Sequence, residues 1–167
     1  GELDTDGLNS FFTEELGWQD LNNTAATTTV NGLRIDAFGV SDAHREWDEL
    51  DEATQALRAL PSRESAALTL GVTHAPYRRI LDEYVDLGAD AIFAGHTHGG
   101  QVCIPGWGAL VANCDIPLRQ ASGLSSWNHR DHTVPLNVSA GLGHSIYAPV
   151  RFGCRPEVSL ITLTARP

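Results

Sequence analysis

The apolar pattern in the middle of the chain predicts two buried strands separated by a helix. Residues 66–73 and 90–94 are short, nearly continuous apolar runs, which are typical of buried strands. Between them, apolar residues recur at helical spacing from Ile80 to Leu87, with Pro76 in the first turn and Gly88 after the last. A strand, a helix and a strand in this order predict parallel neighbours in one sheet, and therefore an α/β fold.

The first third of the chain predicts two more helices and a hairpin. Residues 8–16 carry apolar side chains at helical spacing, with Asp6 as the expected cap. Residues 24–40 read as a hairpin around Asn31-Gly32, a strong type I′ turn signal. Residues 48–60 predict an amphipathic helix, with Asp48 as its cap.

The last third is rich in glycine and proline and predicts only short strands. We expect these strands within residues 101–104, 109–112, 136–140 and 158–164. Residues 119–135 predict a long surface excursion. Trp107 and Trp127 are candidate substrate contacts, although packing or ordinary surface is the commoner role of tryptophan.

Composition narrows the class of protein. The 167 residues are one domain's worth of chain, so we expect a single domain over 1–167. The net charge of −10 and the absence of an arginine cluster disfavour nucleic-acid binding. Three cysteines without a Cys-x-x-Cys pair indicate free thiols. Because the chain has no methionine and starts at Gly1, we expect further sequence upstream.

Three histidines follow the two predicted strands. His74 comes directly after the first, and His96 and His98 come after the second, next to glycines. Extended backbone would point His96 and His98 to the same side. Because the carboxyl ends of parallel strands meet at one edge of a sheet, we expect all three imidazoles to be neighbours in a metal site.

The motifs around these histidines resemble those of a known family. Gly95-His96-Thr97-His98-Gly99-Gly100-Gln101, preceded by Thr73-His74-Ala75-Pro76, is similar to the C-terminal half of calcineurin-like metallophosphoesterases, in particular the bacterial Gly-His-Thr-His-Gly-Gly-Gln subgroup. The segments 119–124, 139–143 and 149–157 support this resemblance.

The resemblance implies a fold and an activity. The chain would form part of a four-layer α/β/β/α sandwich, with the N-terminal strands and motifs absent from this chain. His74 and His96 would bind one metal and His98 a second, the ions being Mn, Fe, Zn or Ni. The full-length enzyme would hydrolyse a phosphoester or pyrophosphate with a metal-bound hydroxide, on a phosphorylated small molecule or lipid.

Several family motifs are missing from this chain. It contains no Gly-Asp and no Gly-Asn-His, so the carboxylate ligands and the catalytic histidine have no counterpart. Two segments, Asp42-Ala43-His44 and Asn128-His129-Arg130-Asp131, carry suitable residue types in the wrong place or order. We therefore expect this chain alone to bind one metal and to be inactive.

The sequence also suggests substrate-binding residues and an alternative function. Gly99, Gly100 and His144 are candidate substrate-binding residues, since glycine-rich loops often face ligands. The alternative to an enzyme is a non-catalytic metal-binding or interaction module that keeps the fold with an incomplete site. We expect a cytoplasmic location, with membrane association left open for the missing N-terminal region, and the pattern predicts no oligomeric state.

Overall fold

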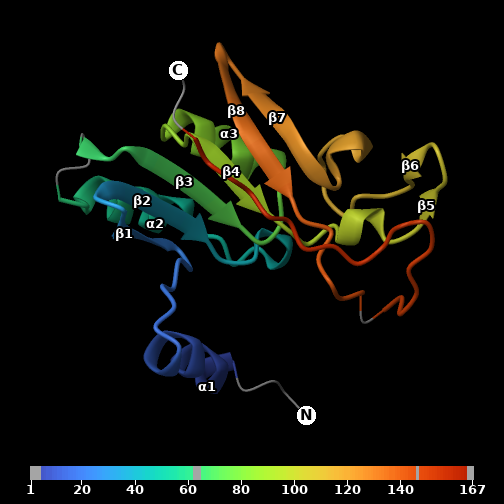
Figure 1. Ribbon diagram of the computed structural model, residues 1–167, viewed down its shortest axis with the longest axis horizontal. Helices are drawn as coiled ribbons and strands as arrows, with labels where there is room; N and C mark the ends of the chain where they lie inside the picture. The colour runs from blue at the N-terminus through green and yellow to red at the C-terminus, as the bar shows by residue number, and fades with distance from the viewer. Residues whose placement is uncertain (1–4, 62–64, 146, 165–167) are drawn as a thin grey trace.

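The computed structural model describes residues 5–61, 65–145 and 147–164. Within them the architecture is mixed α/β, with a six-stranded sheet and a separate two-stranded one (Figure 1). The longer helices are α1 (Thr5–Ser10), α2 (Leu50–Ala59) and α3 (Arg78–Asp86). The strands are β1 (Thr24–Val30), β2 (Leu33–Val40), β3 (Leu68–Thr73), β4 (Ala91–Ala94), β5 (Cys103–Ile104), β6 (Gly108–Ala109), β7 (Gly123–His129) and β8 (His132–Val138).

The centre of the large sheet is parallel, as the apolar pattern predicts. The strand order is β1-β2-β3-β4-β8-β7, and β2, β3, β4 and β8 are mutually parallel neighbours. The predicted hairpin of β1 and β2 is also confirmed. Val30 pairs with Leu33 across Asn31 and Gly32, which both have the positive φ that a type I′ turn needs.

The prediction of a surface excursion over residues 119–135 is wrong. Most of this segment forms β7 and the start of β8, an antiparallel hairpin that completes the large sheet. Trp127 is buried, and its indole N–H donates to the Asp82 carboxylate on α3 at 2.8 Å. The indole therefore anchors the edge of the sheet to a helix, and alternation along β7 was too weak to reveal this.

Both long helices of the middle region cover the same face of the sheet. Tyr84 of α3 and Phe38 of β2 are fully buried with ring centroids 4.6 Å apart, and Leu57 of α2 belongs to the same core. Asp48 does not cap α2, because the cap position is Glu49. Asp48 instead accepts hydrogen bonds from the Arg79 guanidinium, one of them 2.7 Å long, and so ties the start of α2 to α3.

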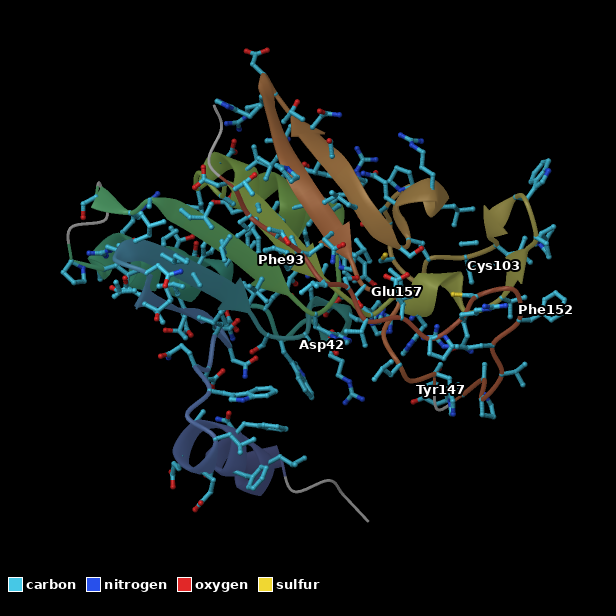
Figure 2. All side chains as sticks on the ribbon, viewed as in Figure 1. Asp42, Phe93, Cys103, Tyr147, Phe152 and Glu157 are labelled. Atoms are coloured by element: carbon cyan, nitrogen blue, oxygen red, sulfur yellow. The ribbon has the colours of Figure 1, made fainter. Side chains whose placement is uncertain are left out.

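The other face of the sheet has little cover. The alternate side chains of β3 that point there, Leu68, Leu70 and Val72, are only partly buried, and Leu124 of β7 is 69% exposed. The C-terminal segment crosses this face in extended form (Figure 1), and Figure 2 labels Phe93 beneath it. Residues 158–164 form no strand, so the prediction of one there is wrong.

The N-terminal helix and the small two-stranded sheet are less regular than the large sheet. The predicted N-terminal helix exists, but it is helical from Thr5 and continues as a π-helical turn over Phe11–Glu15. The side chain of its expected cap, Asp6, lies outside the described residues. The strands expected near 101–104 and 109–112 shrink to the two-residue β5 and β6. No helix in the described ranges is both long and apolar enough to cross a membrane.

Candidate metal centre

Three neighbouring parallel strands are each followed by a histidine at the same edge of the sheet. β3 ends at Thr73 and is followed by His74, and β4 ends at Ala94 shortly before His96. β2 ends at Val40, and the next residues lead to His44. Because these strands run parallel side by side, all of these histidines line one pocket of about 460 Å³.

His74 and His96 face each other directly. The Nδ1 atom of His96 lies 3.1 Å from the Nε2 atom of His74, with the rings close to perpendicular. On its other side, the Nε2 atom of His96 lies 3.1 Å from the carbonyl oxygen of Asn113. Asn113 therefore fixes the orientation of the ring that meets His74.

The His98 side chain lines the same pocket, but the backbone that places it there is not extended as expected. The extended geometry predicted for residues 96–98 is wrong, because His96 and His98 both have positive φ, 67° and 50°, and Thr97 between them is helical. The chain turns sharply after Gly95, and His98 begins a short 3-10 turn, η4 (His98–Gly100). The two imidazoles thus share a pocket through a tight turn.

Thr97 holds this turn in place. Its buried hydroxyl donates to the carbonyl of Ala121 at 2.6 Å and accepts from the N–H of Gly99 at 3.2 Å. The side chain between the two histidines therefore points into the protein, and its hydrogen bonds set the path of the backbone that carries them.

Burial favours the neutral form of two of the site histidines, His96 and His98. Desolvation lowers the pKa of His96, with smaller contributions in the same direction from His74 and His44. Desolvation also lowers the pKa of His98, and the nearby Arg151 guanidinium adds to the effect. Neutral imidazole is the form that binds metals.

Asp42 and His44 were set aside on sequence grounds, yet both line the pocket. The His44 ring lies 4.6 Å from that of His96, and its Nδ1 atom is 2.9 Å from the Tyr77 hydroxyl. The Asp42 carboxylate accepts from the backbone N–H of His44 at 2.9 Å. Their position just after a predicted strand could have identified them. Because β2 runs parallel to β3, both strands end at the same edge of the sheet.

The remaining candidates fall in several places. Gly99 and Gly100 are buried with positive φ, and a Cβ on Gly99 would lie 2.5 Å from the Cys154 sulfur, so both glycines serve close packing. His144 is exposed, with its Nδ1 atom 3.0 Å from the carbonyl of Ser145. His129 lies at the far end of β7 against Asp82 and Asp86 of α3. Trp107 is 87% exposed at the tip between β5 and β6.

The donor set is incomplete by itself. Among the described residues, no group of three or more His, Cys, Asp or Glu side chains is arranged to hold a metal ion. Within this pocket, His74 and His96 bring two imidazole nitrogens to within 3.1 Å of each other.

No protein family model and no solved structure matches the chain. A similarity does exist to the uncharacterized protein YpbG of Bacillus subtilis (strain 168), which is 29% identical over 144 residues. The alignment covers 86% of this chain and 47% of that protein, so the chain spans about half the length of the relative that it matches. The relative's name states no activity.

Proposed function

We propose that this chain is part of a metal-dependent phosphoester hydrolase of the calcineurin-like type, and that it supplies His74, His96 and His98. The observation that carries the proposal is the meeting of all three at the carboxyl edge of parallel strands, in one pocket. The sequence around them is the Gly-His-Thr-His-Gly-Gly-Gln motif on which the resemblance rests.

The facing histidines fit a shared divalent ion. Two nitrogen donors, each about 2.1 Å from one ion, lie roughly 3 Å apart when they subtend a near-right angle. The separation between His96 Nδ1 and His74 Nε2 is 3.1 Å. Imidazole donors suit Mn, Fe, Zn and Ni. Two such ions, when bound, would supply Lewis-acid chemistry for hydrolysis of a phosphorylated small molecule or lipid.

The chain's own residues position these donors. Asn113 fixes the His96 ring, and Thr97 fixes the turn. Arg151 donates to the carbonyls of Gly143 and Gly141, at 2.7 and 3.1 Å, and so holds the loop beside His98. The guanidinium also lies close enough to lower the pKa of His98, so it would keep positive charge beside an anionic phosphoryl group bound there.

The partly covered face of the sheet supports the finer fold proposal. The apolar side chains of β3 and Phe93 of β4 reach that face without full burial, although apolar surface of this kind is normally covered. In a four-layer α/β/β/α sandwich a second sheet would pack here. The relative's length, about twice that of the aligned chain, is consistent with such a second half, which would also bring the missing carboxylate ligands.

One observation favours a second candidate function. Since no group of three donors is arranged for a metal in the described residues, a non-catalytic metal-binding or interaction module with an incomplete site is the alternative. The metal content of the longer protein separates the two. Two ions per chain favour the enzyme, and one or none favours the module.

The direct test is hydrolysis of bis-p-nitrophenyl phosphate in the presence of Mn²⁺ or Ni²⁺. The longer protein is expected to hydrolyse it, and His96→Ala is expected to abolish the activity. The 167-residue chain alone should be inactive. Equal activity of His96→Ala and the unmodified protein would refute the proposed role of these histidines.

A further inference from the structure

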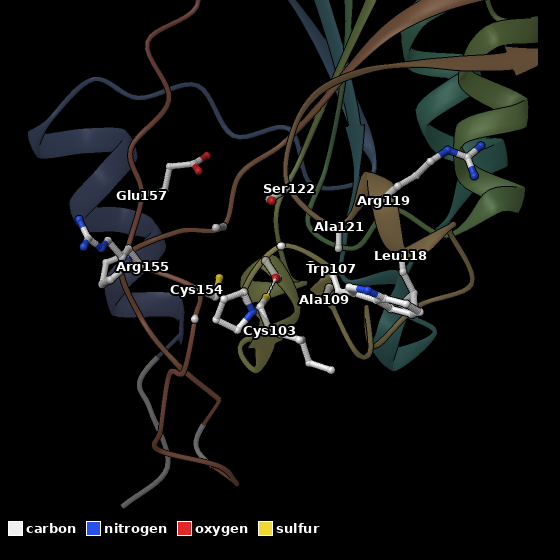
Figure 3. A pocket seen from close by; sticks show the side chains of 18 residues that line it. Cys103, Trp107, Ala109, Leu118, Arg119, Ala121, Ser122, Cys154, Arg155 and Glu157 are labelled. Atoms are coloured by element: carbon white, nitrogen blue, oxygen red, sulfur yellow. Dashed lines mark hydrogen bonds between the residues drawn. The ribbon is translucent and has the colours of Figure 1, made fainter.

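Two cysteines from distant parts of the chain flank the turn that carries His98. Cys103 lies in β5, and Cys154 lies in the C-terminal segment. A parallel bridge joins Val102 to Phe152, and the N–H of Cys103 donates to the carbonyl of Phe152 at 2.7 Å. The two segments therefore run side by side, and Figure 3 shows both sulfur atoms at one wall of a pocket.

Both thiols bind the same piece of backbone. The Cys154 thiol donates to the carbonyl of His98 at 3.2 Å, and the Cys103 thiol donates to the carbonyl of Gly99 at 3.1 Å. Gly99 permits this, since a side chain there would collide with Cys154. Gly153, the residue before Cys154, packs directly on Cys103, since a Cβ at Gly153 would lie 3.4 Å from the Cβ of Cys103.

Small solutes can reach this pair. The pocket has a volume of about 590 Å³, and both cysteines line it. Cys154 is only half-buried, whereas Cys103 is buried. Cys154 is therefore the sulfur that a soluble oxidant would meet first.

We propose that Cys103 and Cys154 form a reversible dithiol–disulfide site that is oxidised by a peroxide. In the first step the Cys154 sulfur attacks hydrogen peroxide, an S–O bond forms, the O–O bond breaks, and one water leaves. In the second step the Cys103 sulfur attacks the sulfenic acid, the S–S bond forms, the S–O bond breaks, and a second water leaves. The dithiol loses two protons and two electrons, and the peroxide takes up both.

The disulfide would change the turn beside it. Neither sulfur would keep a proton, so the carbonyls of His98 and Gly99 would lose their donors. His98 and Gln101 both hold positive φ, 50° and 55°, which costs energy in a residue other than glycine. Losing the two hydrogen bonds would therefore loosen this turn. Any effect on a metal at His98 rests on the proposed function, whereas the disulfide itself does not.

The test is a peptide map of the purified protein after treatment with hydrogen peroxide and alkylation under non-reducing conditions. Chymotrypsin cleavage after Trp107 separates Cys103 from Cys114, which serves as the internal control. The Cys114 thiol donates to the carbonyl of Ala112, two residues earlier in the chain, at 3.4 Å. The expected product is a Cys103–Cys154 linked peptide that dithiothreitol releases, with Cys114 alkylated. A Cys154 sulfinic acid without a link, or links through Cys114 in equal yield, would overturn the proposal.

The effect on the turn has its own readout. Peroxide should raise the rate of amide hydrogen exchange around residues 99–101 in the unmodified protein. It should leave that rate unchanged in Cys154→Ser, which keeps a hydroxyl donor and cannot form the disulfide. Faster exchange in both proteins, or in neither, would overturn the claimed effect. The peptide map of the unmodified protein decides the disulfide even if the variant fails to fold, and neither experiment depends on phosphoesterase activity.

Discussion

Replacing Thr97 by valine should destabilise the protein measurably. Valine keeps the shape of threonine but removes a hydroxyl that makes two hydrogen bonds in a buried position, to Ala121 and from Gly99. Each unpaired buried group costs about 1–3 kcal/mol, and the 3.2 Å bond is the weaker of the two, so we expect a total loss of about 2–3 kcal/mol. Urea unfolding followed by circular dichroism measures this loss.

The matched control is Thr97→Ser. Serine keeps the hydroxyl and loses one buried methyl group, which is worth about 0.8 kcal/mol. Valine should therefore be clearly worse than serine. If Thr97→Val were as stable as Thr97→Ser, or more stable, the hydroxyl would not be holding the turn between the two histidines, and the reasoning would be refuted.

Two further predictions concern the fold beneath the site. Gly71→Ala should cost about 1–3 kcal/mol, because a Cβ there would collide with the Tyr84 ring, whereas Gly143→Ala should cost almost nothing in open space; equal unfolding midpoints would contradict this. The hydrogen bond from Arg79 lowers the pKa of the Asp48 carboxyl, so the ion pair stabilises the fold above the usual carboxyl pKa and stops doing so as the pH falls. Asp48→Asn should therefore reduce stability by about 1 kcal/mol near pH 7 and by progressively less as the pH falls below the usual carboxyl pKa in urea titrations, and a pH-independent difference would refute this.

The parts of the fold that rest on local chemistry could be predicted. Asn31-Gly32 specifies its turn by the φ values that it tolerates, and the apolar runs before His74 and Gly95 specify buried parallel strands. Because His74 and His96 both follow strands that end at the same edge of the sheet, the sequence alone predicted that they lie close together, as the structure has them. The parallel strands and the closeness of His74 to His96 were thus predictable from short local patterns, whereas metal binding by this pair stays a prediction.

The parts that rest on distant contacts could not be predicted. β7 owes its place to pairing with β8 and to Trp127 packing on α3, which its own alternation does not reveal. His44 was discounted because Asp42-Ala43-His44 stands in the wrong place among the family motifs. The parallel pairing of β2 with β3, which brings His44 to the pocket, is a tertiary feature. The turn through His96 and His98 likewise depends on Thr97 reaching a carbonyl 24 residues away in the chain.

The central claim is that His74 and His96 bind one metal ion together. Isothermal titration of the protein with Mn²⁺ or Zn²⁺ tests it most directly, with His132→Ala, an exposed histidine on β8, as the control. The account predicts that His74→Ala and His96→Ala each abolish the same binding event, while His132→Ala leaves it intact. Unchanged metal binding in either His74→Ala or His96→Ala would contradict the account.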